Sequence, residues 1–151
     1  MAPLQKRAWV GLLLGIIWAI VTVIVFITGG GVDAFTEEYS FRLIMDALFV
    51  GWLIIYVILM ASLLSLRRST KGKVNVDERD KAILDRAPIV QLWAVLISLV
   101  AWVIGLTEGY WNRGAVPIMY LYIIFFSSLV VSTIAQSLGI LIGYRRTERY
   151  G

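Results

Sequence analysis

Four long apolar segments divide this sequence, and they constrain its fold more than any other feature. They run from about residue 8 to 28, 41 to 66, 89 to 107 and 118 to 144. A run of about 20 apolar residues is long enough for a helix to cross the hydrocarbon core of a bilayer. Only 16% of the residues are charged and the mean hydropathy is +0.83, whereas soluble domains average about 25% charged residues. The sequence therefore predicts an all-α integral membrane protein, with residues 1–151 as one membrane domain that forms a four-helix bundle of two transmembrane hairpins.

The basic residues predict how these helices are oriented. Of the 14 Lys and Arg residues, 12 lie near the N-terminus, in the linker 67–88 or in the C-terminal tail. The two exceptions are Arg42 and Arg113. Cytoplasmic segments of membrane proteins carry an excess of Lys and Arg. We therefore expect a multi-pass protein of the cytoplasmic (inner) membrane, with both termini and the linker inside the cell. We expect the basic groups to contact lipid headgroups and not nucleic acid.

The composition argues against an enzyme. The chain has no His and no Cys, which removes thiolate and imidazole metal ligands, disulfides and the usual general base. The sequence therefore predicts no catalytic residue, no metal and no cofactor.

Asp46 is the one acidic residue that falls inside an apolar segment. It follows Arg42 by four residues, so the two side chains share a helix face near the outer end of the second segment. Acidic groups inside membranes often bind protons or cations. A local ion pair between Arg42 and Asp46 is the interpretation that the shallow depth favours.

Small residues suggest which helices pack closely. They recur at helical spacing in the first and the last segment, and the predicted helix-packing residues are Gly11, Gly15, Ala19, Ser128, Ser132, Ala135, Gly139 and Gly143. Small side chains let two membrane helices approach closely. We expect these segments to pack together with Gly15 at the depth of Gly139, unless one of them binds a partner helix. The Ser and Gln residues of the last segment fit either interhelical hydrogen bonds or a site for a lipid headgroup or quinone.

Two connections have local signals of their own. Gly29, Gly30 and Gly31 should end the first helix, and a short acidic loop should follow over residues 32–40. In the central linker, Asn75 with Glu78 is a capping arrangement that predicts a short amphipathic helix. Pro88 predicts a break or kink before the third segment. The apolar face of this linker helix, with Ile83 at its centre, should rest on the membrane boundary or on the inner ends of the bundle.

The linker also carries a resemblance. Asp77, Glu78 and Arg79, followed by Ile83, Arg86 and Ala87, match a D-E-R, apolar, basic-Ala pattern. In this pattern and in its topology the chain resembles a family of small bacterial and archaeal four-span membrane proteins whose function is unassigned. The resemblance implies the same two-hairpin layout and brings no catalytic residues.

The favoured function is that of an accessory or scaffold subunit in a larger membrane complex, which acts through helix packing. Its partner would be another membrane protein or a second copy of the chain. A cytoplasmic docking segment would contribute Asp77, Glu78, Arg79, Asp80, Ile83 and Arg86. One alternative is a small proton- or cation-coupled transporter or channel that uses Asp46. Another is a membrane signalling protein whose linker binds a cytosolic regulator.

Overall fold

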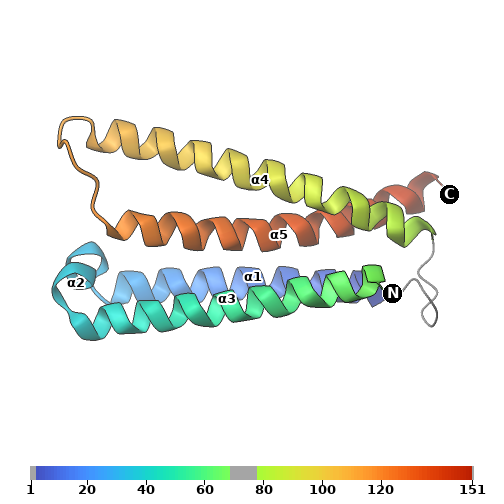
Figure 1. Ribbon diagram of the computed structural model, residues 1–151, viewed down its shortest axis with the longest axis horizontal. Helices are drawn as coiled ribbons and strands as arrows, with labels where there is room; N and C mark the ends of the chain where they lie inside the picture. The colour runs from blue at the N-terminus through green and yellow to red at the C-terminus, as the bar shows by residue number, and fades with distance from the viewer. Residues whose placement is uncertain (1–2, 69–77, 151) are drawn as a thin grey trace.

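The computed structural model of the protein describes residues 3–68 and 78–150, with the side chains of these ranges except those of residues 63–68, 79 and 147–150. The described residues form five helices and no strand: α1 (Pro3–Thr28), α2 (Gly31–Glu37), α3 (Tyr39–Arg68), α4 (Glu78–Tyr110) and α5 (Met119–Tyr150) (Figure 1). Within the described part of the chain, α1, α3, α4 and α5 are long and apolar enough to cross a membrane. The expected all-helical bundle is therefore confirmed for the described residues, with four helices of a length and apolarity suited to crossing a membrane.

The long helix α5 is the centre of the packing. It packs most extensively against α4 and against α1, whereas α3 packs less extensively on α1 and meets α5 only slightly. Both chain ends lie at one end of the bundle, which we call the terminal end (Figure 1). The opposite end carries α2 and the connection from α4 to α5, and we call it the loop end.

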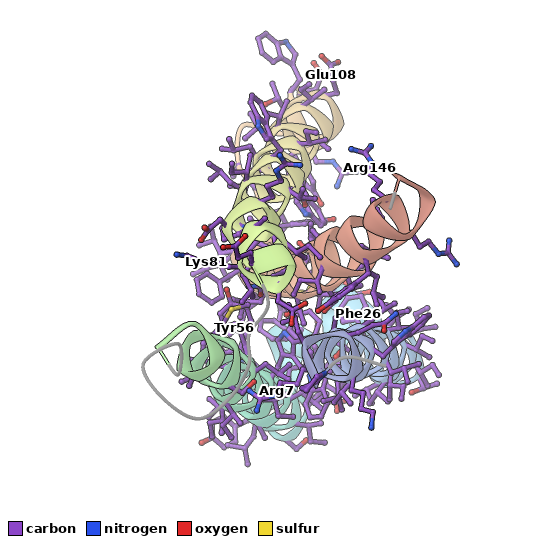
Figure 2. All side chains as sticks on the ribbon, turned by 90° about the vertical axis from the view of Figure 1, so that its right-hand side faces the viewer. Arg7, Phe26, Tyr56, Lys81, Glu108 and Arg146 are labelled. Carbon is purple, nitrogen blue, oxygen red and sulfur yellow. The ribbon has the colours of Figure 1, made fainter. Side chains whose placement is uncertain are left out.

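The helix α4 leans away from the rest of the bundle as it approaches the loop end (Figures 1 and 2). At the terminal end its residues Ile83, Leu84 and Ala87 are buried in one apolar cluster with Ile140 and Tyr144 of α5. None of the residues in its most apolar 18-residue stretch is buried. One face of the first turns of α4 is thus packed in the core, while the apolar stretch that follows leaves most of its surface exposed.

The linker helix is not a separate element. Residues 78–88 continue without interruption into the third apolar segment, and Pro88 lies inside α4. The predicted short helix before a break is therefore wrong. Apolar packing against α5 holds the turns before Pro88 in line, and membrane helices tolerate proline because neighbouring groups satisfy the freed backbone.

The expected loop after α1 is instead partly helical. Gly30 and Gly31 adopt left-handed backbone angles, with φ of 101° and 65°, which glycine reaches without a steric penalty. The chain then reverses into α2, where Phe35 is 4% exposed and packs in a loop-end cluster with Phe41 and Met119. Burial of the Phe35 ring explains why this short acidic segment folds onto the bundle.

Candidate functional site

A groove opens between α4 and α5 at the loop end. Its volume is about 530 Å³, and its lining residues are Ser98, Ala101, Trp102, Gly105, Leu106, Gly109, Tyr110 and Tyr120. We call it the α4 groove. All but the last of these residues belong to α4, so the groove is a property of the leaning half of that helix.

Three small residues form the floor of the α4 groove. Ala101, Gly105 and Gly109 recur every fourth residue and therefore follow one face of α4. A Cβ atom added at Gly105 or at Gly109 would meet no other atom within 4 Å. The backbone of α4 is thus open to close approach at these two positions, and nothing in the described chain uses that access.

Two hydrogen bonds connect α4 to α5 along the groove. The indole Nε1 of Trp102 donates to Ser127 Oγ at 2.8 Å, and the hydroxyl of Tyr110 donates to that of Tyr120 at 2.9 Å. The guanidinium of Arg113 lies 5.4 Å from the centre of the Tyr110 ring. These contacts fix the width of the groove near its two ends.

The glycines of α5 behave differently from those of α4. A Cβ atom at Gly143 would lie 2.9 Å from Ile83 Cγ2, and one at Gly139 would lie 3.5 Å from Ala87 Cα. Gly139 and Gly143 therefore admit α4 to close contact, and the expectation that they face α1 is wrong. The predicted pairing of Gly15 with Gly139 fails because the small residues of α5 are divided between two neighbouring helices.

The small residues of α1 do lie against α5. A Cβ atom at Gly11 would lie 2.8 Å from Ser137 Oγ, and one at Gly15 would lie 3.1 Å from Ile134 Cγ1. Gly15 thus faces a part of α5 about one and a half turns closer to the loop end than the expected Gly139. Ala135 is buried, and Ser128 donates to the carbonyl oxygen of Ile124 in its own helix.

A polar cluster joins three helices in the apolar part of the bundle. Gln91 Nε2 of α4 donates to Ser132 Oγ of α5 at 2.5 Å and lies 3.4 Å from Tyr56 Oη of α3. Tyr56 Oη and Ser132 Oγ are 3.1 Å apart. Ser132 thus makes the interhelical hydrogen bonds that were one expectation for the polar residues of the last segment, and Ser127 does the same with Trp102.

Arg42 and Asp46 do not form the expected ion pair. Arg42 Nη2 donates to the carbonyl oxygen of Thr36 at 3.0 Å, and Nε donates to that of Phe35 at 3.3 Å. Unpaired carbonyls at the C-terminal end of a helix attract cations. The Arg42 guanidinium therefore binds the end of α2 and not Asp46. Asp46 is half-buried and does not line the α4 groove.

The predicted docking residues have different surroundings. Asp77 lies outside the described residues, as does the side chain of Arg79, while Glu78 and Arg86 are exposed at the start of α4. Asp80 accepts a short hydrogen bond from the hydroxyl of Tyr144. Ile83 is 5% exposed and packs inside the terminal-end cluster. Ile83 is thus a core residue and is not available to a partner.

Part of the α4 groove has a signal in the sequence, whereas Tyr56 of the polar cluster has none. Ala101 and Gly105 are recognisable as a small-residue face, and the same four-residue spacing extends to Gly109. Tyr56 lies well inside the second apolar segment, and nothing near it in the sequence indicates which side chains its hydroxyl meets. Its role depends on which helix stands opposite.

The comparisons with known proteins leave the site to be interpreted from its geometry. No protein family matches the chain, and neither a curated protein nor a solved structure matches it.

Proposed function

We propose that the chain is a non-enzymatic accessory or scaffold subunit of a larger membrane complex, and that its α4 groove binds a transmembrane helix of a partner protein. The observation that carries this proposal is the open space at Gly105 and Gly109. Both positions lie on a membrane-crossing helix and on the face that α5 leaves uncovered.

The physics of helix association in lipid supports this assignment. Lipid tails are as apolar as the helices themselves, so close van der Waals packing and interhelical hydrogen bonds drive association. Small residues spaced four apart allow two backbones to approach. The contact of α4 with Gly139 and Gly143 is an example within this chain. A lipid tail gains no comparable contact from a glycine floor, whereas a partner helix does.

The charge distribution supports an orientation with the terminal end in the cytoplasm. Lys6, Arg7, Lys81 and Arg86 lie near that end, as do Arg145 and Arg146 of α5, and the loop end carries Asp33, Glu37 and Glu38. The exposed Glu78 and Arg86 would then form the cytoplasmic docking surface for a partner or for a cytosolic regulator. The resemblance to small four-span membrane proteins supports the same layout.

Transport through Asp46 is the weaker proposal. The Asp46 carboxyl group does not line the α4 groove. Its expected partner Arg42 binds the end of α2 instead.

Co-purification in a mild detergent tests the proposed function. The unaltered chain should retain a stoichiometric membrane-protein partner, and Gly105→Leu with Gly109→Leu should reduce that partner at least about tenfold because leucine fills the floor of the groove. The matched control is Val100→Leu with Val103→Leu, since these side chains are 57% and 65% exposed on the same helix. The control should retain the partner.

Two outcomes would count against this proposal. Equal retention by the glycine variant and the control would remove the groove from the interface. If the purified chain alone forms a dimer that the glycine variant disrupts, the partner is a second copy and not a different subunit.

A further inference from the structure

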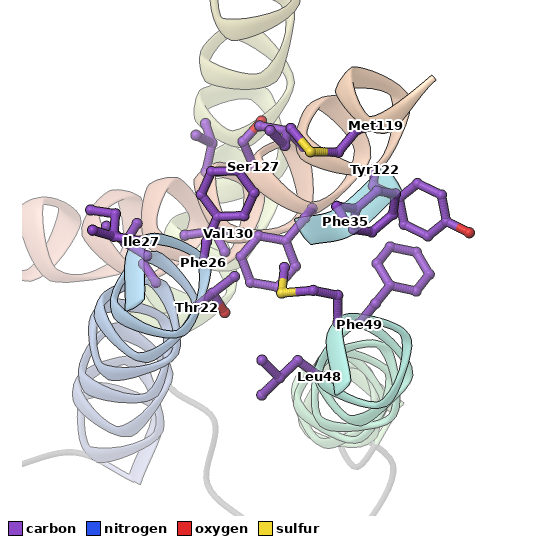
Figure 3. Close-up of a pocket in the computed structure, with 16 residues that line it drawn as sticks. Thr22, Phe26, Ile27, Phe35, Leu48, Phe49, Met119, Tyr122, Ser127 and Val130 are labelled. Atoms are coloured by element: carbon purple, nitrogen blue, oxygen red, sulfur yellow. The ribbon is translucent and has the colours of Figure 1, made fainter. Parts of the chain in front are cut away.

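A second cavity lies inside the triangle formed by α1, α3 and α5, toward the loop end. Its volume is about 500 Å³, which is within the range of ligand pockets. The side chains that line it are Ala19, Thr22, Val23, Phe26, Ile27, Phe35, Met45, Leu48, Phe49, Met119, Tyr122, Ile123, Phe126, Ser127, Val130 and Val131. We call it the α1–α3–α5 cavity (Figure 3).

The wall of this cavity is almost entirely hydrocarbon. Only three of its lining side chains carry a polar atom, and none of them offers it to the interior. Tyr122 directs its hydroxyl outward (Figure 3). Ser127 is engaged by Trp102 and by the carbonyl oxygen of Ile124. Thr22 Oγ1 is itself fully covered. Water needs two or more polar partners to enter a cavity, so this one excludes water.

The boundaries of the cavity restrict what can enter it. Aromatic rings close the seam between α3 and α5, with Phe49 and Tyr122 at 6.2 Å and Tyr122 and Phe35 at 5.3 Å between ring centres. The opposite edge is formed by Val23 and Ile27 of α1, which are 56% and 70% exposed. The cavity is therefore closed by rings between α3 and α5, and its edge along α1 is accessible from outside the bundle.

We infer that the α1–α3–α5 cavity binds a hydrocarbon chain of a bilayer lipid. Water is excluded by the wall, and a helix about 10 Å across is too thick for a space enclosed by three helices and capped by Phe35. A hydrocarbon chain is thin and apolar, and the bilayer supplies it at the exposed edge of α1. Met45 and Met119 in the wall have flexible, polarizable side chains that adapt to an irregular apolar ligand. This site is separate from the α4 groove.

Two stacked tryptophans beside the cavity provide a built-in reporter. Trp18 lies one helical turn from Thr22, and Trp52 lies one turn from Leu48. Their rings stack with centres 5.6 Å apart, and Trp52 is completely buried. A brominated chain that enters the cavity would quench their fluorescence.

The test titrates the full chain, in a detergent that does not quench, with a fatty acid brominated near its methyl end. We expect quenching that saturates at one equivalent and is reversed by excess unbrominated acid of the same length. Ala19→Phe fills the cavity, so the concentration of brominated acid that gives half-maximal quenching should rise at least about tenfold. The control Ile20→Phe adds a ring at a neighbouring position that is 53% exposed and should leave the titration unchanged.

A second variant keeps the inference testable if Ala19→Phe does not fold. Phe26→Ala enlarges the cavity and should increase the binding of a methyl-branched brominated chain relative to a straight one. Quenching that never saturates, identical titrations for Ala19→Phe and Ile20→Phe, or an unchanged preference in Phe26→Ala would overturn the inference. A changed oligomeric state in Ala19→Phe with unaltered quenching would do the same, because it would assign the cavity to a second copy.

Discussion

Single polar side chains determine which helices of this bundle stay in contact. Gln91, Tyr56 and Ser132 come from three different helices and meet around one pair of oxygens. Their hydrogen bonds give α3 a specific attachment to α4 and α5, with which it otherwise packs little. At the terminal end, Arg7 Nη1 donates to the carbonyl oxygen of Ser62 at 2.5 Å and joins α1 to the last turns of α3. Figure 2 labels Arg7 in a view from that end.

Replacement of Gln91 tests the polar cluster at the scale of one residue. Interhelical hydrogen bonds in membrane proteins contribute about 0.6 kcal/mol on average and up to about 1.7 kcal/mol. Gln91→Leu removes two donor contacts, so we expect a loss of about 1 kcal/mol in the free energy of unfolding, measured in mixed micelles. Combined with Ser132→Ala, the loss should be smaller than the sum of the two single losses, because the residues share a bond. Strict additivity would show that the cluster is not coupled.

Among the helices, the positions of their ends were easier to predict than their partners. Gly29 and its neighbours end α1 as expected, since the stop is local chemistry. It was not predictable that α5 packs with its glycines on α4 and with other residues on α1. A small residue permits close packing but does not determine which helix packs against it. The continuity of α4 through Pro88 was missed for a related reason. The packing of Ile83 and Ala87 on α5 outweighs the local preference of proline to end a helix.

Matched leucine substitutions on α5 and α4 test this division of contacts. At Gly143 a new side chain meets Ile83 at once, whereas at Gly105 it enters open space. We expect Gly143→Leu to lower the free energy of unfolding by about 1–3 kcal/mol, the usual cost of overpacking. Gly105→Leu should leave it within about 0.5 kcal/mol of the unaltered protein. Thermal unfolding in detergent measures both. Equal losses would mean that α4 and α5 pack evenly along their length.

At the scale of the whole molecule, the four membrane-crossing helices follow directly from the lengths of the apolar segments, whereas the two hollows do not. The α4 groove exists because α4 leans away from α5. The α1–α3–α5 cavity exists because the side chains of three helices leave a space of about 500 Å³ between them toward the loop end. Both features are set by relative helix tilt, which apolar length alone does not determine. A sequence can therefore predict which residues are small, but not whether the space beside them is filled.

The orientation of the whole bundle is the remaining prediction, and the chain suits a direct test because it contains no cysteine. Basic residues gather at the terminal end, so we expect that end to face the cytoplasm. Gln5→Cys and Arg146→Cys should react with a membrane-impermeant thiol reagent only after the cells are permeabilised. Glu37→Cys and Arg113→Cys, in exposed positions at the loop end, should react in intact cells. The reverse pattern would place the charged face of α4 outside the cell and remove the cytoplasmic docking role of Glu78 and Arg86. The proposal that the α4 groove binds a helix would remain, since it does not depend on the orientation of the bundle.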